Sequence, residues 1–444
     1  SSEQMIYIVN HAEDKVIFVD LTFVPILAAL KDHLPKDLIY VAMTDRKHMP
    51  DTDIVNLLCY EDLMEAETTD FDWPEFDENT ACGLCYTSGT TGNPKGALYS
   101  HRSTVLHAMM GVISLQTCLR PGKRILPVVP LFHVNAWGLP YAAPLSGASL
   151  IFPGAALDGP SLHKLMEDER VFSAWGVPTV WMGLLSEIKA KGGKPSSFKE
   201  VIIGGSAAPR PMIEAFENMD VSVAHAWGMT EMSPIGTVGV LNLEQENLPL
   251  SERIDLKAKQ GRRVFGVDLK IVDEDGNRMP HDGVAQGELY VRGNAVVSAY
   301  FKNEEASKTS IDADGWFGTG DVAKIEPNGM LTITDRAKDL IKSGGEWISS
   351  IDVENMAMAH ESVANCAVIA IPDPKWDERP LLIVVPAQGA ERDAISILES
   401  LSKSLAKWQL PDAVIFVDEL PLTATGKVSK LTLRQRHNDG TLSA

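Results

Sequence analysis

The chain predicts an α/β protein with a large N-terminal domain of βαβ-type subdomains plus a small β-rich subdomain, followed by a small α+β C-terminal domain. Residues 5 to 60 alternate the apolar runs MIYIV, VIFVD and LIYVAM with the helical pattern FVPILAALKDHL, the rhythm of a parallel sheet with crossover helices. Residues 261 to 300 contain short alternating strands with Asp-Gly turns. Residues 350 to 444 combine a helix, the strands VANCAVIAIPD and LLIVVPA, and an amphipathic helix around Ile397 and Leu401.

Composition limits the classes of partner. A chain of 444 residues with 45% hydrophobic content can bury a large core in two or more domains. Lys+Arg 40 against Asp+Glu 60 gives a formal net charge of −20, which argues against nucleic acid and anionic membranes as partners. Five cysteines are an odd count, and no secretory leader opens the sequence, so a cytoplasmic location is expected.

Two local patterns resemble functional features, a cysteine pair for metal or redox chemistry and a membrane span, but the surrounding sequence favours structural roles for both. Cys82 and Cys85 form a C-x-x-C without a second pair at metal spacing, so a strand is favoured over zinc or redox chemistry. Residues 125 to 157 carry no charged side chain, but five prolines divide them into pieces too short to cross a bilayer. We therefore expect no membrane span, and this stretch is predicted to form buried strands and turns.

The stretch from 86 to 96, YTSGTTGNPKG, has the composition of a phosphate-holding loop. Its glycines allow successive backbone N–H groups to converge on an anion, and its hydroxyls and lysine add donors and charge. The lysine stands between proline and glycine, which is not the Walker spacing. The flanking apolar runs predict a strand, a loop and a strand, followed by a helix that Ser100 can cap. A plain surface linker is the alternative. The candidate phosphate-binding residues are Thr87, Ser88, Gly89, Thr90, Thr91, Gly92 and Lys95.

Further segments follow in a fixed order: GGSAAPRPM from 204, HAWGMTE from 225, GWFGTGD from 315, TDRAKDLIKSGGEWIS from 334 and PLTATGK from 421. With the loop, they resemble the acyl- and aryl-adenylating enzymes, the family of acyl-CoA synthetases, luciferases and peptide-synthetase adenylation domains. The resemblance covers nearly the whole chain. Trp227 stands where the family more often has Tyr or Phe, and Gly318 replaces a residue that is often polar or basic, which puts a nearby surface contact in doubt.

The resemblance implies ATP as a substrate and Mg²⁺ as its counter-ion. The glycines would lie against adenine, Trp227 would stack on it, Asp321 would take both ribose hydroxyls and Arg336 would reach ribose or phosphate. The implied nucleotide-binding residues after the loop are Gly204, Gly205, Ser206, Ala226, Trp227, Gly228, Asp321 and Arg336. The implied catalytic residues are Lys427, Glu231, Thr230 and the pivot Lys338, with Glu231 and Thr91 as metal-binding residues.

Acyl and CoA contacts are implied for three other segments. PLFHVNAWG supplies His133 and Trp137, although a lone His and Trp are ordinarily core residues. The pattern GGEWIS resembles fatty acyl-CoA synthetases in particular. The remaining residues implied on the acyl and CoA side are Asp339, Lys342, Gly344, Gly345, Glu346, Trp347 and Glu378.

The resemblance divides the chain into an adenylation domain at 1–335, whose first part is expected to be absent, a hinge at 336–339 and a mobile lid domain at 340–444. The expected reaction is ATP-dependent adenylation of a short or medium acid, 3-methylmercaptopropionate being favoured, followed by thioester formation with CoA. A homodimer is one expected assembly. The alternatives are a medium- or long-chain fatty acyl-CoA synthetase, a carrier-protein-dependent adenylation domain, and a nucleotide-binding sensor without turnover.

Overall fold

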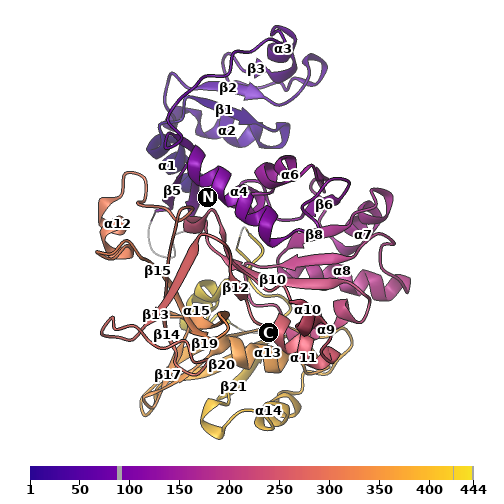
Figure 1. Cartoon of the computed structure of the whole chain (residues 1–444), viewed down its shortest axis with the longest axis vertical. Coiled ribbons are helices and arrows are strands. Elements are labelled where there is room, and N and C mark those ends of the chain that lie inside the picture. The colour runs from indigo at the N-terminus through magenta and orange to yellow at the C-terminus, as the bar shows by residue number, and fades with distance from the viewer. Residues whose placement is uncertain (88–92, 424, 443–444) are drawn as a thin grey trace.

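Figure 1 shows the computed structural model of the chain, which describes residues 1–87, 93–423 and 425–442. A small sheet, a large sheet and a third sheet follow one another along the chain, from the top of the view to the bottom. The predicted α/β class is confirmed. The candidate phosphate-binding residues Ser88, Gly89, Thr90, Thr91 and Gly92 lie outside the described residues.

The first sheet is parallel: β1 pairs with β2, and β2 pairs with β3. Since α2 connects β1 to β2, the predicted βαβ rhythm is confirmed here. The prediction of a strand for MIYIV is wrong, because Met5, Ile6 and Val9 recur at helical spacing and pack on the core of this unit. The elements are α1 (Ser2–Ala12), β1 (Val16–Val19), α2 (Val24–Leu30), β2 (Ile39–Ala42), β3 (Leu58–Cys59) and α3 (Tyr60–Glu65).

The candidate phosphate loop joins two antiparallel strands, β4 (Ala81–Thr87) and β5 (Lys95–Ser100), so the predicted strand, loop and strand are confirmed. The Ser100 side chain accepts a hydrogen bond from the Ser103 N–H and caps α4 (His101–Ser114), as expected. Cys82 and Cys85 both lie on β4 as free thiols, the first exposed and the second buried.

The large sheet has 11 strands among the described residues, in the order β13-β14-β15-β16-β12-β11-β10-β9-β8-β6-β7. Its parallel part runs from β7 to β10, and the rest of the sheet, from β11 to β13, is antiparallel. The predicted β-rich residues 261–300 supply β12, β13 and β14 of this antiparallel part. The strands are β6 (Arg124–Pro127), β7 (Ser149–Leu150), β8 (Ser173–Gly176), β9 (Glu200–Ile203), β10 (Ser222–Gly228), β11 (Ile235–Val238), β12 (Gly261–Arg263), β13 (Val267–Val272), β14 (Gly287–Gly293), β15 (Phe317–Ile325) and β16 (Met330–Arg336).

The prediction of buried strands and turns for the uncharged stretch from 125 to 157 is only partly right. It contains β6 and β7, as expected, but its middle is the helix α6 instead of further strands and turns. Pro140 stands in the first turn, where a missing N–H costs little, and Leu139, Ala142 and Ala143 face the core. The helices around the large sheet are α5 (Val134–Trp137), α6 (Leu139–Ser146), α7 (Gly159–Asp168), α8 (Pro178–Lys191), α9 (Arg210–Glu217), α10 (Leu243–Glu246), α11 (Leu250–Lys257) and α12 (Glu304–Ser310).

The third sheet follows the large one in sequence and has its own core, which includes Val353, Val368, Leu382 and Ile397. The predicted helix, paired strands and amphipathic helix are present as α13, β19 with β20, and α14. The elements are β17 (Ile341–Ser343), β18 (Glu346–Ile348), α13 (Ser350–Met358), β19 (Val363–Asp373), β20 (Asp377–Pro386), α14 (Ala394–Ser402), β21 (Ala413–Phe416) and α15 (Lys430–Asn438).

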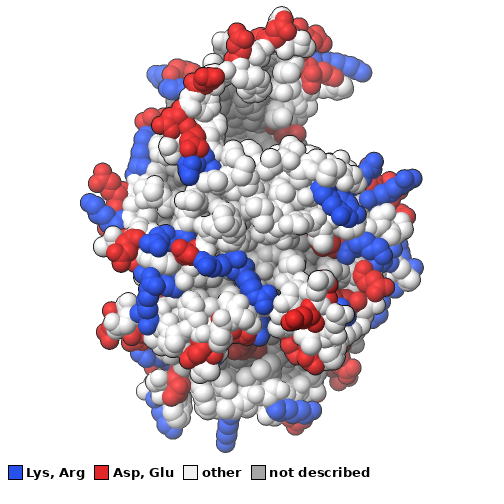
Figure 2. All heavy atoms as spheres, in the orientation of Figure 1, with Lys and Arg blue, Asp and Glu red and all other residues white. Residues whose placement is uncertain are grey.

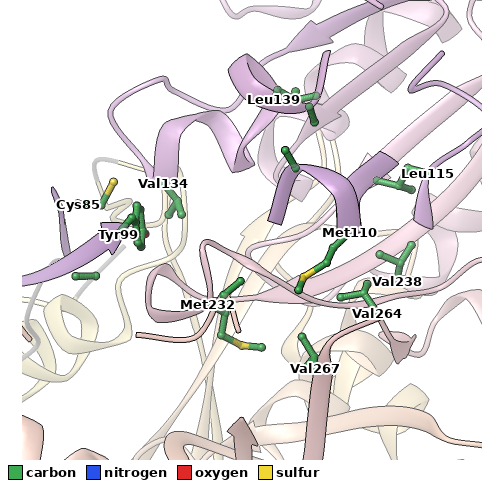
Figure 3. Close-up of a cluster of buried hydrophobic side chains, with 14 of the residues drawn as sticks. Cys85, Tyr99, Met110, Leu115, Val134, Leu139, Met232, Val238, Val264 and Val267 are labelled. Carbon is green, nitrogen blue, oxygen red and sulfur yellow. The ribbon is translucent and has the colours of Figure 1, made fainter. Parts of the chain in front are cut away.

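One core cluster fixes the β4–β5 hairpin against the large sheet. Figure 3 shows Tyr99 of β5 and Met110 of α4 among the side chains of this cluster, which also includes Val238 of β11. Because burial of such side chains removes apolar surface from water, the ends of the phosphate loop are held on a rigid support. Among the described residues, none of the helices has the length and apolar character needed to cross a bilayer.

Candidate active site

A cavity of about 460 Å³ lies where the parallel and antiparallel parts of the large sheet meet. Its walls come from the ends of β9, β10, β15 and β16, from the hairpin and from the segment before α15. Carboxyl ends of parallel strands are the usual ligand sites of open α/β sheets. The predicted site residues that line it are Thr87, Lys95, His133, Trp137, Gly204, Gly205, Ala226, Trp227, Gly228, Thr230, Glu231, Arg336, Lys338 and Lys427.

Strand β10 sets the position of the cavity because it changes partners along its length. Residues 222 to 225 pair with β9 in parallel, whereas Ala226 and the following residues pair with β11 antiparallel, with a register shift after Trp227. Gly204, just beyond β9, lies against this junction: a Cβ there would lie 3.0 Å from the Ala226 carbonyl oxygen and 3.1 Å from Trp137 Cη2. The glycine therefore allows close packing of backbone and ring. The predicted Ser206 is exposed and does not line the cavity.

Lys427 reaches the cavity from the C-terminal part of the chain. A Cβ on Gly205 would lie 3.1 Å from Lys427 Cε, and Gly205 has φ +80, a conformation that favours glycine. The Thr179 hydroxyl of α8 donates to the Gly426 carbonyl at 2.9 Å and anchors the lysine segment. Burial, and then the charge of Arg336, lower the Lys427 pKa to about 8, while Asp321 opposes the shift. Among the described residues, no carboxylate forms an ion pair with Lys427, so its positive charge suits an incoming anion.

Asp321 is held by two other predicted residues. Trp227 Nε1 donates to Asp321 Oδ2 at 2.9 Å, and Arg336 Nε lies 3.0 Å from Asp321 Oδ1. Burial raises the pKa of Asp321, and the Arg336 charge and the Trp227 hydrogen bond oppose that shift. Gly318 lines the same wall and packs on Tyr290, since a Cβ there would lie 3.2 Å from Tyr290 Cε1. This packing gives a physical reason for its departure from the family pattern.

Glu231 and Thr230 lie in the short 3-10 helix η4 (Thr230–Met232), directly after the β10 junction. The Glu231 carboxylate is 6% exposed and accepts a hydrogen bond from the Tyr300 hydroxyl at 2.6 Å, while the Tyr99 hydroxyl donates to the Thr230 carbonyl at 2.6 Å. Lys95 Nζ lies 5.1 Å from the centre of the Tyr300 ring. Tyr99 and Tyr300 were not predicted, because neither belongs to a motif.

The carboxylate of Glu231 fits Mg²⁺ only in combination with substrate oxygens. Tyr300 occupies one of its oxygens, which leaves a second for a cation. Within residues 1–87, 93–423 and 425–442 there is no group of three or more His, Cys, Asp or Glu side chains able to hold a metal. Magnesium characteristically takes one or two carboxylates and completes its shell with phosphate and water, so a single glutamate is a suitable donor.

The segment with His133 and Trp137 adopts an uncommon backbone. Val134, Asn135, Ala136 and Trp137 have φ between 46 and 58, so α5 is a turn in the left-handed region. Such a conformation costs free energy in L-residues and persists where the surroundings enforce it, often at functional sites. The turn directs Trp137 toward Gly204. Burial, and then the Lys427 charge, lower the His133 pKa to about 4, so His133 is neutral near pH 7.

The other predicted acyl and CoA residues lie outside the cavity, and several of them lie close to one another on or beside the β17–β18 hairpin. Lys342 and Trp347 are on the β17–β18 hairpin, where Lys342 Nζ lies 5.6 Å from the centre of the Trp347 ring, and the Lys342 N–H donates to Glu378 Oε2 at 2.9 Å. Trp347 is 44% exposed. Gly344 and Gly345 form the turn of this hairpin, with φ +61 and +88. The residues not brought to the cavity are Asp339, Lys342, Gly344, Gly345, Glu346, Trp347 and Glu378.

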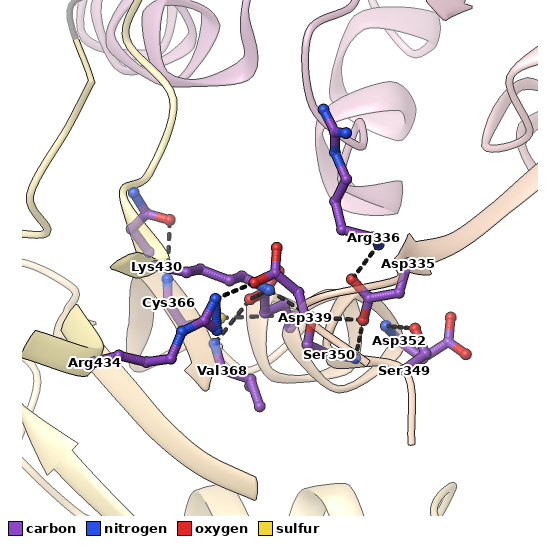
Figure 4. Close-up of polar contacts among 12 residues, drawn as sticks. Asp335, Arg336, Asp339, Ser349, Ser350, Asp352, Cys366, Val368, Lys430 and Arg434 are labelled. Atoms are coloured by element: carbon purple, nitrogen blue, oxygen red, sulfur yellow. Dashed lines mark hydrogen bonds and ion pairs between the residues drawn. The ribbon is translucent and has the colours of Figure 1, made fainter. Parts of the chain in front are cut away.

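Polar contacts surround the segment 336–339 (Figure 4). Asp335 Oδ2 accepts hydrogen bonds from the N–H and the hydroxyl of Ser350, both at 2.6 Å, at the start of α13. On the other side, Arg434 of α15 forms an ion pair with Asp339. Lys338 lies between these contacts and lines the cavity. Asp339 therefore belongs to the polar network of the C-terminal part and not to the cavity.

Comparison with known proteins shows the family. Residues 1–301 match the AMP-binding enzyme family, and residues 352–427 match the AMP-binding enzyme C-terminal domain. The chain therefore belongs to the AMP-binding enzyme family.

Three similar proteins illustrate its range. The chain is 50% identical over 438 residues to a 3-methylmercaptopropionyl-CoA ligase of Ruegeria lacuscaerulensis, covering 98% of this chain and 81% of that protein. It is 49% identical over 438 residues to a medium-chain fatty acid–CoA ligase of Ectopseudomonas oleovorans, covering 98% and 80%. A crystal structure of the anthranilate CoA ligase AuaEII with anthranoyl-AMP superimposes with a TM-score of 0.88 at 26% identity, covering 99% and 81%.

These similarities define the activity. The chain is an AMP-forming acyl-CoA synthetase, an acid–thiol ligase with the α/β fold of the adenylating enzymes. ATP, a carboxylic acid and CoA are its small-molecule substrates, and Mg²⁺ is the general requirement of the family.

Proposed function

We propose that the acid is short or medium in length, with 3-methylmercaptopropionate as the first candidate. Relatives at 50% and 48% identity are named 3-methylmercaptopropionyl-CoA ligases. One structural observation supports a short acid. Leu115, 2% exposed, is part of the wall of the 460 Å³ cavity and also of a second cavity of about 410 Å³. Leu115 thus borders both spaces, and we propose that its side chain limits the length of an acid that extends from the Lys427 region.

A medium-chain fatty acid is the second candidate, because a relative at 49% identity is named for that substrate. A longer chain needs a longer space, which displacement of Leu115 would provide. The two candidates differ in chain length, which is measurable.

The proposed first half-reaction is attack of the acid carboxylate on the α-phosphorus of ATP, with release of pyrophosphate. Both reactants are anions, so the site must neutralise charge at the reacting phosphorus. The cavity wall includes the lysines Lys95, Lys338 and Lys427. Lys427 and Lys95 are suited to neutralise this charge, and the Thr230 hydroxyl is a donor for the same phosphate. The Glu231 carboxylate, oriented by Tyr300, would hold Mg²⁺, which neutralises phosphate charge. Asp321 and Trp227 would bind the ribose and the adenine.

The proposed second half-reaction requires a different arrangement, in which CoA thiol attacks the acyl-adenylate and releases AMP. Lys427 occupies the cavity while the β17–β18 hairpin lies outside it, which supports a structure arranged for adenylation. We propose that residues 340–444 rotate as a lid on residues 1–335 about the hinge 336–339, with Lys338 as the pivot. Rotation withdraws Lys427 and brings Gly344, Gly345 and Trp347 to the carbonyl.

The test of the substrate proposal is AMP and pyrophosphate formation with CoA over a panel from 3-methylmercaptopropionate and butanoate to palmitate. The wild type should give its highest kcat/KM with the short acids. Leu115→Ala should raise the octanoate-to-butanoate ratio by about tenfold or more, because a few methylenes gain space. Leu119→Ala is the control, since Leu119 is equally buried and lines neither cavity. A wild-type optimum at palmitate, or activity only with a carrier protein, would contradict the proposal.

We also propose that the enzyme is a cytoplasmic homodimer. An exposed apolar strip on α4 and α6, formed by Val105, Met109, Ile113, Tyr141 and Leu145, supports self-association. Figure 2 shows that the face over these helices is largely uncharged. The odd cysteine count suits a reducing compartment. Light scattering should show a dimer that Met109→Glu with Ile113→Glu dissociates, and a monomeric wild type would contradict it.

A further inference from the structure

The Lys427 segment, residues 425–428, is held in shape by hydrogen bonds to Thr423. The Thr423 N–H donates to the Lys427 carbonyl at 2.7 Å, and the Lys427 N–H donates to the Thr423 hydroxyl at 3.2 Å. The Gly426 N–H donates to the Thr423 carbonyl at 2.9 Å, and Gly426 has φ +78, which glycine adopts without strain. These local bonds set the shape of the segment, but they do not set its position relative to the large sheet.

Few hydrogen bonds join the adenylation domain to the proposed lid domain. Among the described residues, Thr334 and Asp335 accept hydrogen bonds from the start of α13, directly beside the hinge. Away from the hinge, the described part of the chain has one such bond, in which the Thr179 hydroxyl donates to the Gly426 carbonyl at 2.9 Å. This bond therefore lies where a rotation about the hinge would move the two partners apart.

The first turn of α8 and the residue before it form the surface on which Gly426 lies. A Cβ on Gly426 would lie 3.3 Å from Val177 Cγ2 and 3.4 Å from Thr179 Oγ1. A Cβ on Gly205 would lie 3.1 Å from both Val177 Cγ1 and Lys427 Cε. The same short stretch of the adenylation domain thus contacts the backbone of the segment and lies beside the lysine side chain. Thr179 itself does not line the cavity, so it acts on the reaction only through the residues that it holds.

The Thr179 hydrogen bond differs in kind from the apolar packing around it. A hydroxyl-to-carbonyl bond is directional and is made only at one placement of the two groups, whereas apolar contacts tolerate small displacements. Both groups can bond to water after a rotation, so the bond shifts the balance between two arrangements by a factor of only about three to ten. This factor is large enough to favour adenylation and small enough to be overcome in every turnover.

We propose that Thr179 is a positioning residue for adenylation, whose hydrogen bond to Gly426 holds Lys427 at the reacting phosphate and is broken before thioester formation. This inference rests on the proposed function, including the proposed rotation of the lid domain. It goes beyond that function by assigning the placement of the lysine to one hydroxyl group outside the cavity.

The first experiment removes the hydroxyl and keeps the shape of the side chain. Thr179→Val should lower the kcat of acyl-adenylate formation about three- to tenfold, measured as pyrophosphate release with the most active acid of the panel. Thioester formation from the supplied acyl-adenylate should not fall, because the bond is already broken in that step. Thr179→Ser retains the hydroxyl and should restore most of the lost adenylation rate. A loss of folding would instead lower both half-reactions.

A double-mutant cycle tests whether Thr179 acts through Lys427. In the Lys427→Ala protein, the group to be positioned is gone, so adding Thr179→Val should lower adenylation no further. The same fold-change in the wild-type and Lys427→Ala backgrounds would overturn the proposal, because Thr179 would then act independently of the lysine.

Thr237→Val is the matched control. It removes a buried hydroxyl that donates to the Gln260 carbonyl at 2.6 Å within the adenylation domain, and Thr237 does not line the cavity. The ratio of its two half-reaction rates should equal that of the wild type, whatever its stability. Equal losses in both half-reactions of Thr179→Val, or an adenylation loss that Thr179→Ser does not restore, would overturn the role of the hydroxyl. Absence of pyrophosphate release from the wild type with every acid would instead count against the proposed function and is recognisable as a separate result.

Discussion

Two loops of the C-terminal part differ in where they lie. The segment with Gly426 and Lys427 enters the cavity and is anchored by Thr179 of α8, whereas the β17–β18 hairpin with Gly344 lies outside it. The hairpin is part of the third sheet and the Lys427 segment follows the sheet's last strand in sequence, β21, so a rigid-body movement of that sheet together with this segment would move both. The contrast is the basis of our proposal that this arrangement serves adenylation and that thioester formation needs a different placement of the third sheet.

The largest effect should come from removing the positive charge of Lys427 from the cavity. Lys427→Ala is expected to lower acyl-adenylate formation by about a thousandfold, because one preorganised donor at the reacting phosphate is lost. Thioester formation from supplied acyl-adenylate should change little. Pyrophosphate release and thioester formation measure the two steps separately. The control is Lys403→Ala, an exposed lysine of the same part of the chain. Equal loss of both steps would break the proposed division of labour.

A substitution in the β17–β18 hairpin, outside the cavity, should impair thioester formation and spare adenylation. Gly344 has φ +61, and a Cβ on it would lie 2.7 Å from Trp376 Cε3, so Gly344→Ala must displace the turn. We expect thioester formation from acyl-adenylate to fall by roughly 10- to 100-fold through misplacement of the turn, with adenylation unchanged. Gly389→Ala is the matched control, because Gly389 has φ +77 and open space around it. A loss confined to adenylation would contradict the assignment of this hairpin.

A smaller effect should appear in the pH dependence of the two half-reactions, to which the two loops are assigned. With a Lys427 pKa of about 8, the lysine is charged below that pH and loses its charge as the pH rises through it. The kcat/KM for adenylation should therefore fall by about tenfold between pH 7 and pH 9, reporting the free enzyme. Lys427→Arg should abolish this fall, since arginine stays charged. Thioester formation from acyl-adenylate should show no such fall, and an identical decline in both steps would remove the contrast.

The regular elements and the order of the segments could be predicted from short stretches. Ser100 capping α4, the strands around the phosphate loop and the βαβ rhythm of β1, α2 and β2 all depend on residues close in sequence. Periodicity failed where it was ambiguous. MIYIV suits a strand or a helix and becomes α1. The stretch around Pro140 contains the helix α6 because Pro140 stands in its first turn, where a proline is tolerated, although Pro144 lies inside the helix.

By itself, the sequence determined the class of protein and most of the polar site, because glycine, hydroxyl and lysine at fixed spacing are local properties of a loop. Only the tertiary structure decided which groups hold those residues. The Tyr300 hydroxyl meets Glu231 across 69 residues of chain, and Trp227 meets Asp321 across 94. The position of Leu115 beside both cavities is likewise invisible in any motif, since it arises where apolar side chains from separate elements pack. Such contacts depend on how the chain folds back on itself, and spacing along the sequence does not record them.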